Sequence, residues 1–376
     1  MNQPDLVYYI ALSLLPGIGN ITAKHLMSYC GGVKAIFETP RKQLLKIPEV
    51  GIKTADIIAQ HAESVWPRAE EEVAFIEKNG IQALLFADKN YPQRLKPLHD
   101  SPIVLFYKGM ANLNMPRSIA IIGTRNATEY GKEICDQLVS EIAQLDPSIC
   151  VVSGLAYGID GLAHRACLKH KQPTIGVLAH GLDRIYPPAH RDLAQKMSEQ
   201  GGGILTELMT GTLPERENFP QRNRIVAGLS DAVVVVQTGQ KGGSLITVEY
   251  AHSYNRLVFA FPGKINDPYS RGCHQLVKQE KAILCTELTD IADMLFWLPE
   301  QNDNSKAKAA QAQLFVELSD TERRVADALQ QAGKSLHLSD LMLQTQLGPG
   351  IMAATLLNLE LKGVVRPQPG SMFVAV

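Results

Sequence analysis

Between Ser118 and about Leu298 the sequence repeats one pattern, in which a short apolar run is followed by a stretch with helical periodicity. This alternation predicts strands and helices wound around a parallel sheet, because parallel strands need a long crossover connection and are covered on both faces. A doubly wound α/β fold is therefore expected for this region. The runs that fit strands are Ile119–Ile122, Ile149–Val152, Thr174–Leu178, Ile204–Thr206, Ala232–Val236 and Leu257–Phe261.

The rest of the chain divides into smaller units. Residues 1–66 read as short helices, and residues 67–298 combine a proline-punctuated connector, expected as a lead-in strand or a loop, with the α/β core. Residues 299–313 are polar and featureless, which predicts a linker. Residues 314–376 regain helical periodicity and are expected to form a separate C-terminal domain.

An internal repeat marks the N-terminal helices. Pro16 and Gly19 recur as Pro48 and Gly51, each 32 residues later, in a pattern typical of tandem helix-hairpin-helix or SAM-like units. Free N–H groups after such a hairpin can hold a phosphate, but Glu49 replaces the first hairpin glycine of the second copy and would repel one. Residues 1–66 also carry only six basic against five acidic residues. Packing or partner contacts are therefore favoured over DNA clamping.

The C-terminal domain has the pattern of a winged helix. Residues 319–322 have capping-box spacing ahead of one helix, two further helices are expected at Leu338–Gln346 and Ile351–Lys362, and residues 364–374 read as a hairpin. The third helix of such a domain often enters the major groove, yet Lys362 is its only basic residue. Protein contact or weak DNA contact is therefore expected rather than base reading.

Charge and cysteine content limit the possible partners. Lysine and arginine total 37 against 38 acidic residues, so no global positive field draws in nucleic acid and any contact must be local. The six cysteines form neither a CxxC pair nor a set at metal spacing, which predicts reduced, mostly buried thiols and no metal site. No signal-peptide start and no membrane-length apolar run occur, so a cytoplasmic protein without membrane contact is expected.

Glycine-bearing turns follow three of the predicted strands. Ligands of an open parallel sheet bind where such turns lead into helix N-termini, at the carboxyl edge of the strands. Small residues let the backbone approach a phosphate, and arginine can direct two N–H bonds to one. Together with the run Arg222-Asn223-Arg224, the turns predict an anion-binding edge on a Rossmann-like sheet. The turns are Gly123–Thr128, Ser153–Asp160 and Gly239–Thr247.

Several ligands and reaction types are disfavoured at this edge. A dinucleotide site needs a G-x-G-x-x-G turn and an acidic residue ending the second strand, whereas this strand ends at Ser153-Gly154. The P-loop pattern G-x-x-x-x-G-K-[ST] is missing. No nucleophile elbow or H-E-x-x-H helix occurs, so no cofactor and no catalytic residue is predicted. His164 is expected to hydrogen-bond Asp160, one helical turn before it.

At these loops the chain resembles the DNA-processing protein A family, also called DprA or Smf. The matching stretches span the predicted core, and the flanking helical and winged-helix domains fit the same family. The resemblance implies a non-enzymatic homodimer that binds and protects single-stranded DNA in natural transformation and helps to load the recombinase RecA. The stretches are Ala120–Arg125, Val152–Asp160 with His164, Gly181–Asp183 with Tyr186-Pro187, Phe219–Ile225 and Gly243–Thr247.

Carried over residue by residue, the resemblance also implies where DNA phosphates bind, with Arg125 as the first candidate. Because only 6% of the residues are aromatic, base stacking is expected to contribute little. The chain departs from the family pattern at Lys241-Gly242, where a shorter Ser-Gly-Ser is frequent, and at Lys281, where glycine is usual. The implied residues are Gly123, Thr124, Arg125, Ser153, Gly154, Arg222, Asn223, Arg224, Lys241, Gly243, Ser244 and Thr247.

Two alternatives stay open at this point. Gly243, Thr247 and Glu249 fall in a stretch that nearly reproduces P-G-G-x-G-T-x-x-E, the signature of lysine-decarboxylase-like nucleotide phosphoribohydrolases, although Ile246 stands where that signature has glycine. This pattern favours a nucleotide-binding enzyme. The second alternative is an interaction scaffold whose two helical end domains recruit partners. A scaffold predicts no phosphate-dependent affinity.

Overall fold

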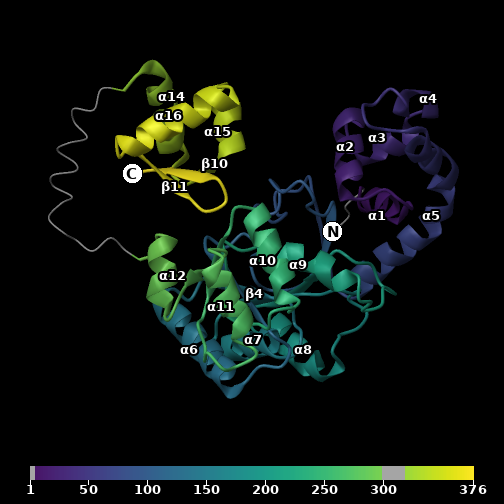
Figure 1. Cartoon of the computed structure of the whole chain (residues 1–376). Coiled ribbons are helices and arrows are strands. Elements are labelled where there is room, and N and C mark those ends of the chain that lie inside the picture. The colour runs from purple at the N-terminus through teal and green to yellow at the C-terminus, as the bar shows by residue number, and fades with distance from the viewer. Residues whose placement is uncertain (1–4, 299–317) are drawn as a thin grey trace.

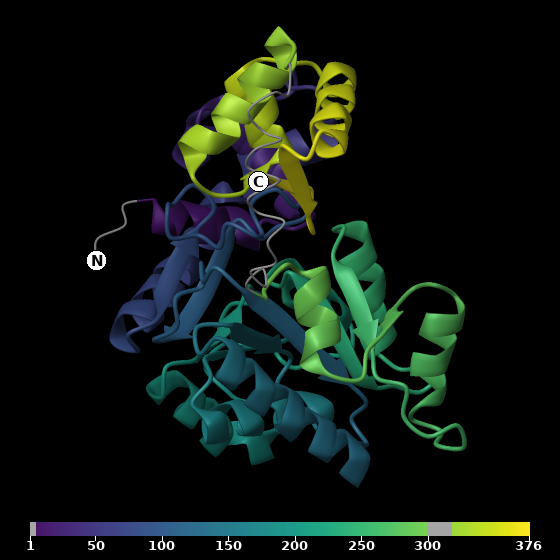
Figure 2. The same cartoon turned by 90° about the vertical axis from the view of Figure 1, so that its left-hand side faces the viewer.

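The computed structural model describes residues 5–298 and 318–376 and shows three units (Figure 1). A group of N-terminal helices and a C-terminal winged-helix domain both lie on one side of a larger α/β core, and the view turned by 90° shows the same arrangement (Figure 2). The fold class expected from the sequence is confirmed. The predicted linker, residues 299–313, lies outside the described residues.

The N-terminal helices contain the predicted repeat. They are α1 Leu6–Leu14, α2 Asn20–Cys30, α3 Val33–Glu38, α4 Arg41–Leu44 and α5 Ile52–Lys78. Gly17 has φ +74°, and Glu49, at the matching place 32 residues later, has φ +62°, in a region that favours glycine. Gly19 and Gly51 directly precede α2 and α5. The last helix does not stop near residue 66 but continues through the first part of the expected connector.

A mostly parallel sheet forms the core. Its strands are β1 Gln82–Leu85, β2 Val104–Gly109, β3 Ser118–Gly123, β4 Cys150–Ser153, β5 Thr174–Val177, β6 Gly203–Thr206, β7 Ala232–Gln237, β8 Leu257–Ala260 and β9 Ile283–Leu284. β4, β5 and β6 follow one another on one side of β3, and β7, β8 and β9 on the other. The winding therefore reverses after β6, which brings the carboxyl ends of β3, β4 and β7 together at one edge.

Different helices cover the two faces of the sheet. The helices of the core are α6 Glu129–Leu145, α7 Ile159–His170, α8 Arg191–Glu199, α9 Asn218–Gly228, α10 Ser244–Ser253, α11 Arg271–Lys278 and α12 Leu288–Met294. Alternate strand side chains point to opposite faces, so Ile122 packs with α9, α10 and α11, whereas Ile121 packs with α6, α7 and α12. Burial on both faces explains why the central strands read as continuous apolar runs.

The six predicted strands are present, and three strands add to them. β1 and β2 lie in the segment expected as a lead-in strand or loop, and they extend the sheet beyond β6 as antiparallel strands. β9 has two residues and pairs with β8 at the opposite edge. A strand this short leaves no recognisable apolar run, because the period of two needs several residues to show.

The C-terminal residues form the predicted winged helix. Its elements are α14 Asp320–Ala332, β10 Leu336–His337, α15 Leu338–Thr345, α16 Pro349–Leu361, β11 Val365–Gln368 and β12 Met372–Ala375. Ser319 caps α14, and its hydroxyl and the Glu322 side chain form the reciprocal pair that their spacing predicts. The wing between β11 and β12 contacts the core, where the Gly370 N–H donates to the carbonyl oxygen of Asn255 (2.9 Å).

The cysteines agree with the prediction of reduced, mostly buried thiols. Cys30 is half-buried, the other five are buried, and none is in a disulfide. Burial raises the pKa of the Cys135 thiol to about 12, which makes it unreactive at neutral pH. No helix in the part of the chain that the structure describes is both long and apolar enough to cross a bilayer.

Candidate functional site

The turns after β3, β4 and β7 meet at the carboxyl edge of the sheet and form one groove. Gly158 has φ +73°, and a Cβ there would lie 2.1 Å from the carbonyl oxygen of Thr124, so glycine is needed for the β4 turn to lie against the β3 turn. The Ile159 N–H donates to the same oxygen (3.1 Å). The β7 turn is linked to α9, because the Asn223 side chain donates to the carbonyl oxygen of Gly243 (3.4 Å).

The groove has a volume of about 730 Å³ and is predominantly cationic. Among the described side chains that line it, Asp160 is the one carboxylate. Ser244 and Thr247 line it from the first turns of α10, whose N-terminus carries a partial positive charge. The surface therefore suits a polyanion. The basic residues in its lining are Arg125, Arg216, Arg222 and Lys241.

Arg222 forms part of the groove floor. Its guanidinium donates to the carbonyl oxygens of Gly154 and Val177, and the residue is 5% exposed. Burial lowers the pKa of Arg222 to about 10, and the nearby Asp160 opposes that shift. The guanidinium is therefore charged at neutral pH and fixes the β4 turn to the end of β5.

Asp160 balances this buried cation. A Cβ on Gly154 would lie 2.6 Å from both the Asp160 carboxylate and the Arg222 guanidinium, so both groups lie against this glycine. Burial raises the pKa of Asp160, whereas Arg222 and the N–H of Ala156 lower it. The two buried groups therefore compensate one another inside the floor, so removal of either one leaves the other without its neighbour. The other basic side chains of the groove are left to face a ligand.

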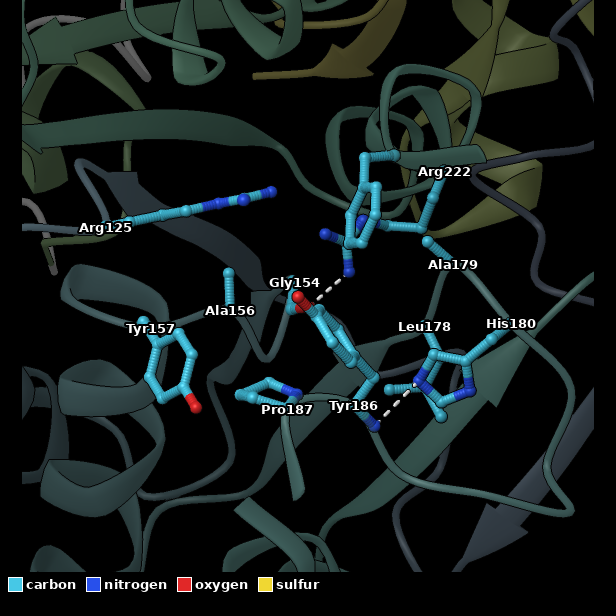
Figure 3. Close-up of a pocket in the computed structure, with 11 residues that line it drawn as sticks. Arg125, Gly154, Ala156, Tyr157, Leu178, Ala179, His180, Tyr186, Pro187 and Arg222 are labelled. Atoms are coloured by element: carbon cyan, nitrogen blue, oxygen red, sulfur yellow. Dashed lines mark hydrogen bonds between the residues drawn. The ribbon is translucent and has the colours of Figure 1, made fainter. Parts of the chain in front are cut away.

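Arg125 extends across one end of the groove, where aromatic side chains gather (Figure 3). Arg125 is exposed, and its guanidinium lies 5.1 Å from the centre of the Phe219 ring. Tyr186 packs edge-on against the same ring with centroids 6.0 Å apart, and Tyr157 lines the same hollow. Aromatic rings and guanidinium planes of this kind can stack on nucleobases. The low aromatic content of the whole chain gave no indication of this local concentration.

Ten of the twelve residues implied by the family resemblance line this groove, and two do not. Ser153 is buried, and its hydroxyl donates to the carbonyl oxygen of Ile121 (2.6 Å). Arg224 is 9% exposed and donates to Glu207 and to the carbonyl oxygen of Asp100. Both residues therefore connect parts of the protein to one another and lie outside the groove.

Sequence reasoning left out Arg216 and the aromatic residues of the groove. Phe219 is followed at helical spacing by Arg222, Asn223 and Val226, which also line the groove, so one face of α9 is turned toward it. That spacing was a sufficient indication for Phe219. Arg216 lies in the loop before α9, where no periodicity indicates which side chains turn inward.

The residues that suggested a phosphoribohydrolase do not form one site. Glu249 lies on the exposed side of α10 and forms an ion pair with Lys281 (2.8 Å), away from the side chains that line the groove. The same ion pair gives a role to Lys281, which stands where the family usually has glycine. Within residues 5–298 and 318–376, no group of three or more His, Cys, Asp or Glu side chains could hold a metal ion.

His164 does not bond to Asp160, so the expectation from their spacing is wrong. Its Nδ1 lies 2.7 Å from the hydroxyl of Thr174, because the imidazole turns toward β5 beneath the groove. The ring is completely buried. Burial lowers the pKa of His164 to about 3, so the imidazole is neutral in the folded protein and belongs to its interior.

The fold and the groove define a class of protein: a Rossmann-like core with a cationic groove at the carboxyl edge of its sheet and a helical domain at each end. Residues 82–296 match the DNA recombination-mediator protein A family, and residues 306–371 match the DprA winged helix domain. The chain belongs to the DNA recombination-mediator protein A family. This confirms the family that its loop motifs indicated.

Several bacterial proteins are similar to this chain over most of their length. The DNA processing protein DprA of Bacillus subtilis is 42% identical over 250 residues, which cover 66% of this chain and 82% of that protein. The X-ray structure of DprA from Streptococcus pneumoniae aligns with a TM-score of 0.65 and 31% identity over 76% of this chain and 96% of that one. DprA from Helicobacter pylori, whose structure concerns a unique single-stranded DNA binding mode, aligns with a TM-score of 0.51 and 30% identity over 57% and 95% of the two chains.

Proposed function

We propose that the groove binds the sugar-phosphate chain of single-stranded DNA. The observation that carries this proposal is the convergence of Arg125, Arg216 and Lys241 on one surface that also includes the start of α10. Basic side chains and helix N-termini both favour phosphate. A chain with a net charge of −1 needs such a local concentration of charge to bind a polyanion.

A single strand suits this groove better than a duplex. Its backbone is flexible enough to follow three neighbouring turns, and its unpaired bases are free to stack. Phe219, with Arg125 over its face and Tyr186 at its edge, offers a stacking surface. Such stacking contributes about 1–3 kcal/mol per base. The structural similarity to the Helicobacter pylori protein supports the same choice of ligand.

The wider role that we infer rests on the family. The protein acts in the bacterial cytoplasm as a homodimer, protects single-stranded DNA during natural transformation and helps to load RecA on it. Membership in a recombination-mediator family supports this role. Analytical sedimentation of the protein alone and retention of RecA by the immobilised protein are the direct measurements. A strict monomer that does not retain RecA would contradict the inference.

We infer a binding role rather than catalysis. The placement of Glu249 supports this choice, because the one carboxylate of the phosphoribohydrolase-like stretch forms an ion pair with Lys281 and does not line the groove. Incubation with nucleoside monophosphates and chromatography of the products tests the alternative. Release of free base at enzyme-like rates would establish an enzyme and remove our proposal.

The decisive experiment measures fluorescence anisotropy of a labelled oligo-dT over a series of salt concentrations. Arg125→Ala is expected to weaken binding about tenfold, since one hydrogen-bonded charge pair with phosphate is lost. The slope of log K against log salt should decrease by about 0.7 for the phosphate that is no longer neutralised. Arg165→Ala, an exposed arginine of α7 outside the groove lining, is the matched control and should bind like the wild type. Equal affinity of the two variants would favour the scaffold alternative.

A further inference from the structure

The N-terminal helices fix both ends of one wall of the groove. This wall, residues 211–223, leads from the segment after β6 into α9 and carries Arg216 and Phe219. The residue before it, Thr210, is bonded to α5, and the residue after it, Arg224, is connected to α2. In each attachment a carboxylate is largely withdrawn from solvent, Glu72 in the first and Glu207 in the second.

At the first attachment, one turn of α5 binds every polar group of Thr210. The Thr210 N–H donates to Glu72 Oε1 (3.0 Å), and its hydroxyl donates to the same carboxylate. Arg68 Nη2 donates to the carbonyl oxygen of Thr210 (2.7 Å) and to Glu72 Oε2 (2.7 Å). Glu72 is 2% exposed, whereas its neighbour Glu71 is exposed. A carboxylate tolerates such burial only when its oxygens are matched by donors, so the contact is specific.

At the second attachment, Glu207 joins α9 to α2. Its carboxylate accepts from Arg224 and from the Asn20 side chain (3.2 Å). The side-chain oxygen of Asn20 accepts from the Ile103 N–H (3.1 Å), and Arg224 also donates to the carbonyl oxygen of Asp100 (2.7 Å). Asn20 is the first residue of α2. The start of the helix after the first hairpin is therefore bonded to the core.

Apolar and loop contacts extend these attachments toward the aromatic end of the groove. Met209 and Leu182 pack against the apolar cluster of the N-terminal helices. The Gly211 N–H donates to Asp183 Oδ1 (3.2 Å), which connects the wall to the loop that carries Tyr186. The helices thus hold two sides of the hollow next to Arg125.

We propose that Glu72 is a positioning residue for nucleic-acid binding, through which the N-terminal helices hold residues 211–223 in the conformation that binds. The proposal rests on the groove being the single-stranded DNA site. A preorganised wall loses less conformational entropy when its side chains engage a ligand. Release of Thr210 allows the wall to move, so affinity falls although no group that touches the ligand has changed.

The test uses the full-length protein and two measurements on each variant. Anisotropy with oligo-dT gives the affinity, and hydrogen–deuterium exchange gives the protection of amides 208–223. Glu72→Ala is expected to weaken binding about fivefold and to speed exchange across this segment. Glu72→Gln keeps an oxygen that accepts from the Thr210 N–H and should recover part of both effects. Glu71→Ala, on the exposed side of the same turn, is the control and should leave both measurements unchanged.

The outcomes separate this inference from the proposed function. Loss of affinity in Arg125→Ala without any change in Glu72→Ala would overturn the positioning role alone, whereas full affinity in Arg125→Ala would overturn the DNA groove itself. Weaker binding by Glu72→Ala with unchanged exchange of residues 208–223 would also overturn the positioning role of Glu72. If Glu72→Ala does not fold, Thr210→Val removes only the two hydrogen bonds of the hydroxyl, which donates to Glu72 and accepts from Arg68. It should still weaken binding about twofold, and wild-type affinity would count against the proposal.

Discussion

The groove and α16, the third helix of the winged helix, are two surfaces where a chain of this architecture could meet DNA, and they are built in opposite ways. Four basic side chains converge on the groove. At the end of α16, Lys362 pairs with Glu322 of α14 (2.8 Å), while Ile351 and Leu357 of α16 are more than half exposed. A helix that reads a major groove presents polar and basic side chains to the bases. The surface of α16 is suited to protein contact instead.

The two regions differ in the arrangement of their basic side chains and not in their total charge. The whole chain has a net charge of −1, and residues 314–376 carry five basic and six acidic residues. In the core the basic residues come from segments far apart in the sequence and meet at one sheet edge. In the winged helix they are dispersed, and the exposed face of α16 carries Ile351, Leu357 and Leu361 beside Asn358 and Glu360, with no basic side chain between Pro349 and Leu361.

Within the groove, Arg222→Met is expected to cause the largest loss of unfolding free energy. The change leaves the buried Asp160 without its neighbouring cation and leaves the carbonyl oxygens of Gly154 and Val177 without this donor. Loss of one partner of a buried pair costs about 3–5 kcal/mol of unfolding free energy. Urea denaturation measures it.

A second variant shows whether the unpaired charge is the cause. Adding Asp160→Asn to Arg222→Met removes the buried carboxylate and should recover a large part of the lost stability, since both charges are then gone. If the double variant is as unstable as the single one, the two carbonyl oxygens and not the charge pair account for the effect. No comparable loss is expected for Lys132→Met, because its ion pair with Glu129 of α6 is exposed on both sides.

A buried imidazole gives the region beneath the groove a pH dependence that α16, which contains no histidine, does not share. The pKa of His164 falls from 6.5 to about 3, mainly through burial. Between these values the unfolded chain binds a proton that the folded protein excludes, so the unfolding free energy falls as the pH falls. The loss is about 2 kcal/mol from pH 7 to pH 5, because the slope approaches about 1.4 kcal/mol per unit below pH 6.5.

Denaturation of wild type and His164→Leu at pH 7 and pH 5 measures this dependence. The variant cannot bind the proton and should lose less stability over the same interval. His61→Ala, at an exposed position of α5, should keep the wild-type pH dependence. Equal slopes for wild type and His164→Leu would show that other groups control the acid response.

The smallest effect is expected on α16. Leu357→Gln replaces an exposed apolar side chain, so it should change the unfolding free energy by less than about 0.5 kcal/mol. It should also leave oligo-dT affinity within about twofold of the wild type, because α16 lies outside the proposed site. Anisotropy under the conditions used for Arg125→Ala gives a direct comparison. A loss similar to that of Arg125→Ala would make the winged helix part of the DNA site.

Local patterns allowed much of the fold to be predicted, and tertiary contacts account for what was missed. The central strands and the winged helix follow from apolar periodicity and from the capping box at Ser319. The length of α5 did not follow, because Pro67 normally ends or bends a helix and yet lies inside this one. Arg68 and Glu72 anchor the helical turn that follows Pro67 to the core. No local sequence pattern indicates these contacts.

The two arginines of α9 show what the sequence could still have revealed about the site. Arg222 and Arg224 are two residues apart, which separates them by about 200° around a helix. They therefore cannot share a face once a helix is predicted there. Arg222 turns to the groove floor and Arg224 to Glu207. Which of the two faces the groove depends on the sheet order, which only the assembled fold supplies.

The hydrogen bond between Asn20 and Glu207 can form only late in the synthesis of the chain. The two residues are 187 positions apart, so the first helices leave the ribosome long before their acceptor has been translated. At about 5–20 residues per second this delay lasts on the order of 10–40 s. During that interval the apolar surface that later receives Met209 stays uncovered, so chaperones and other nascent chains can reach it.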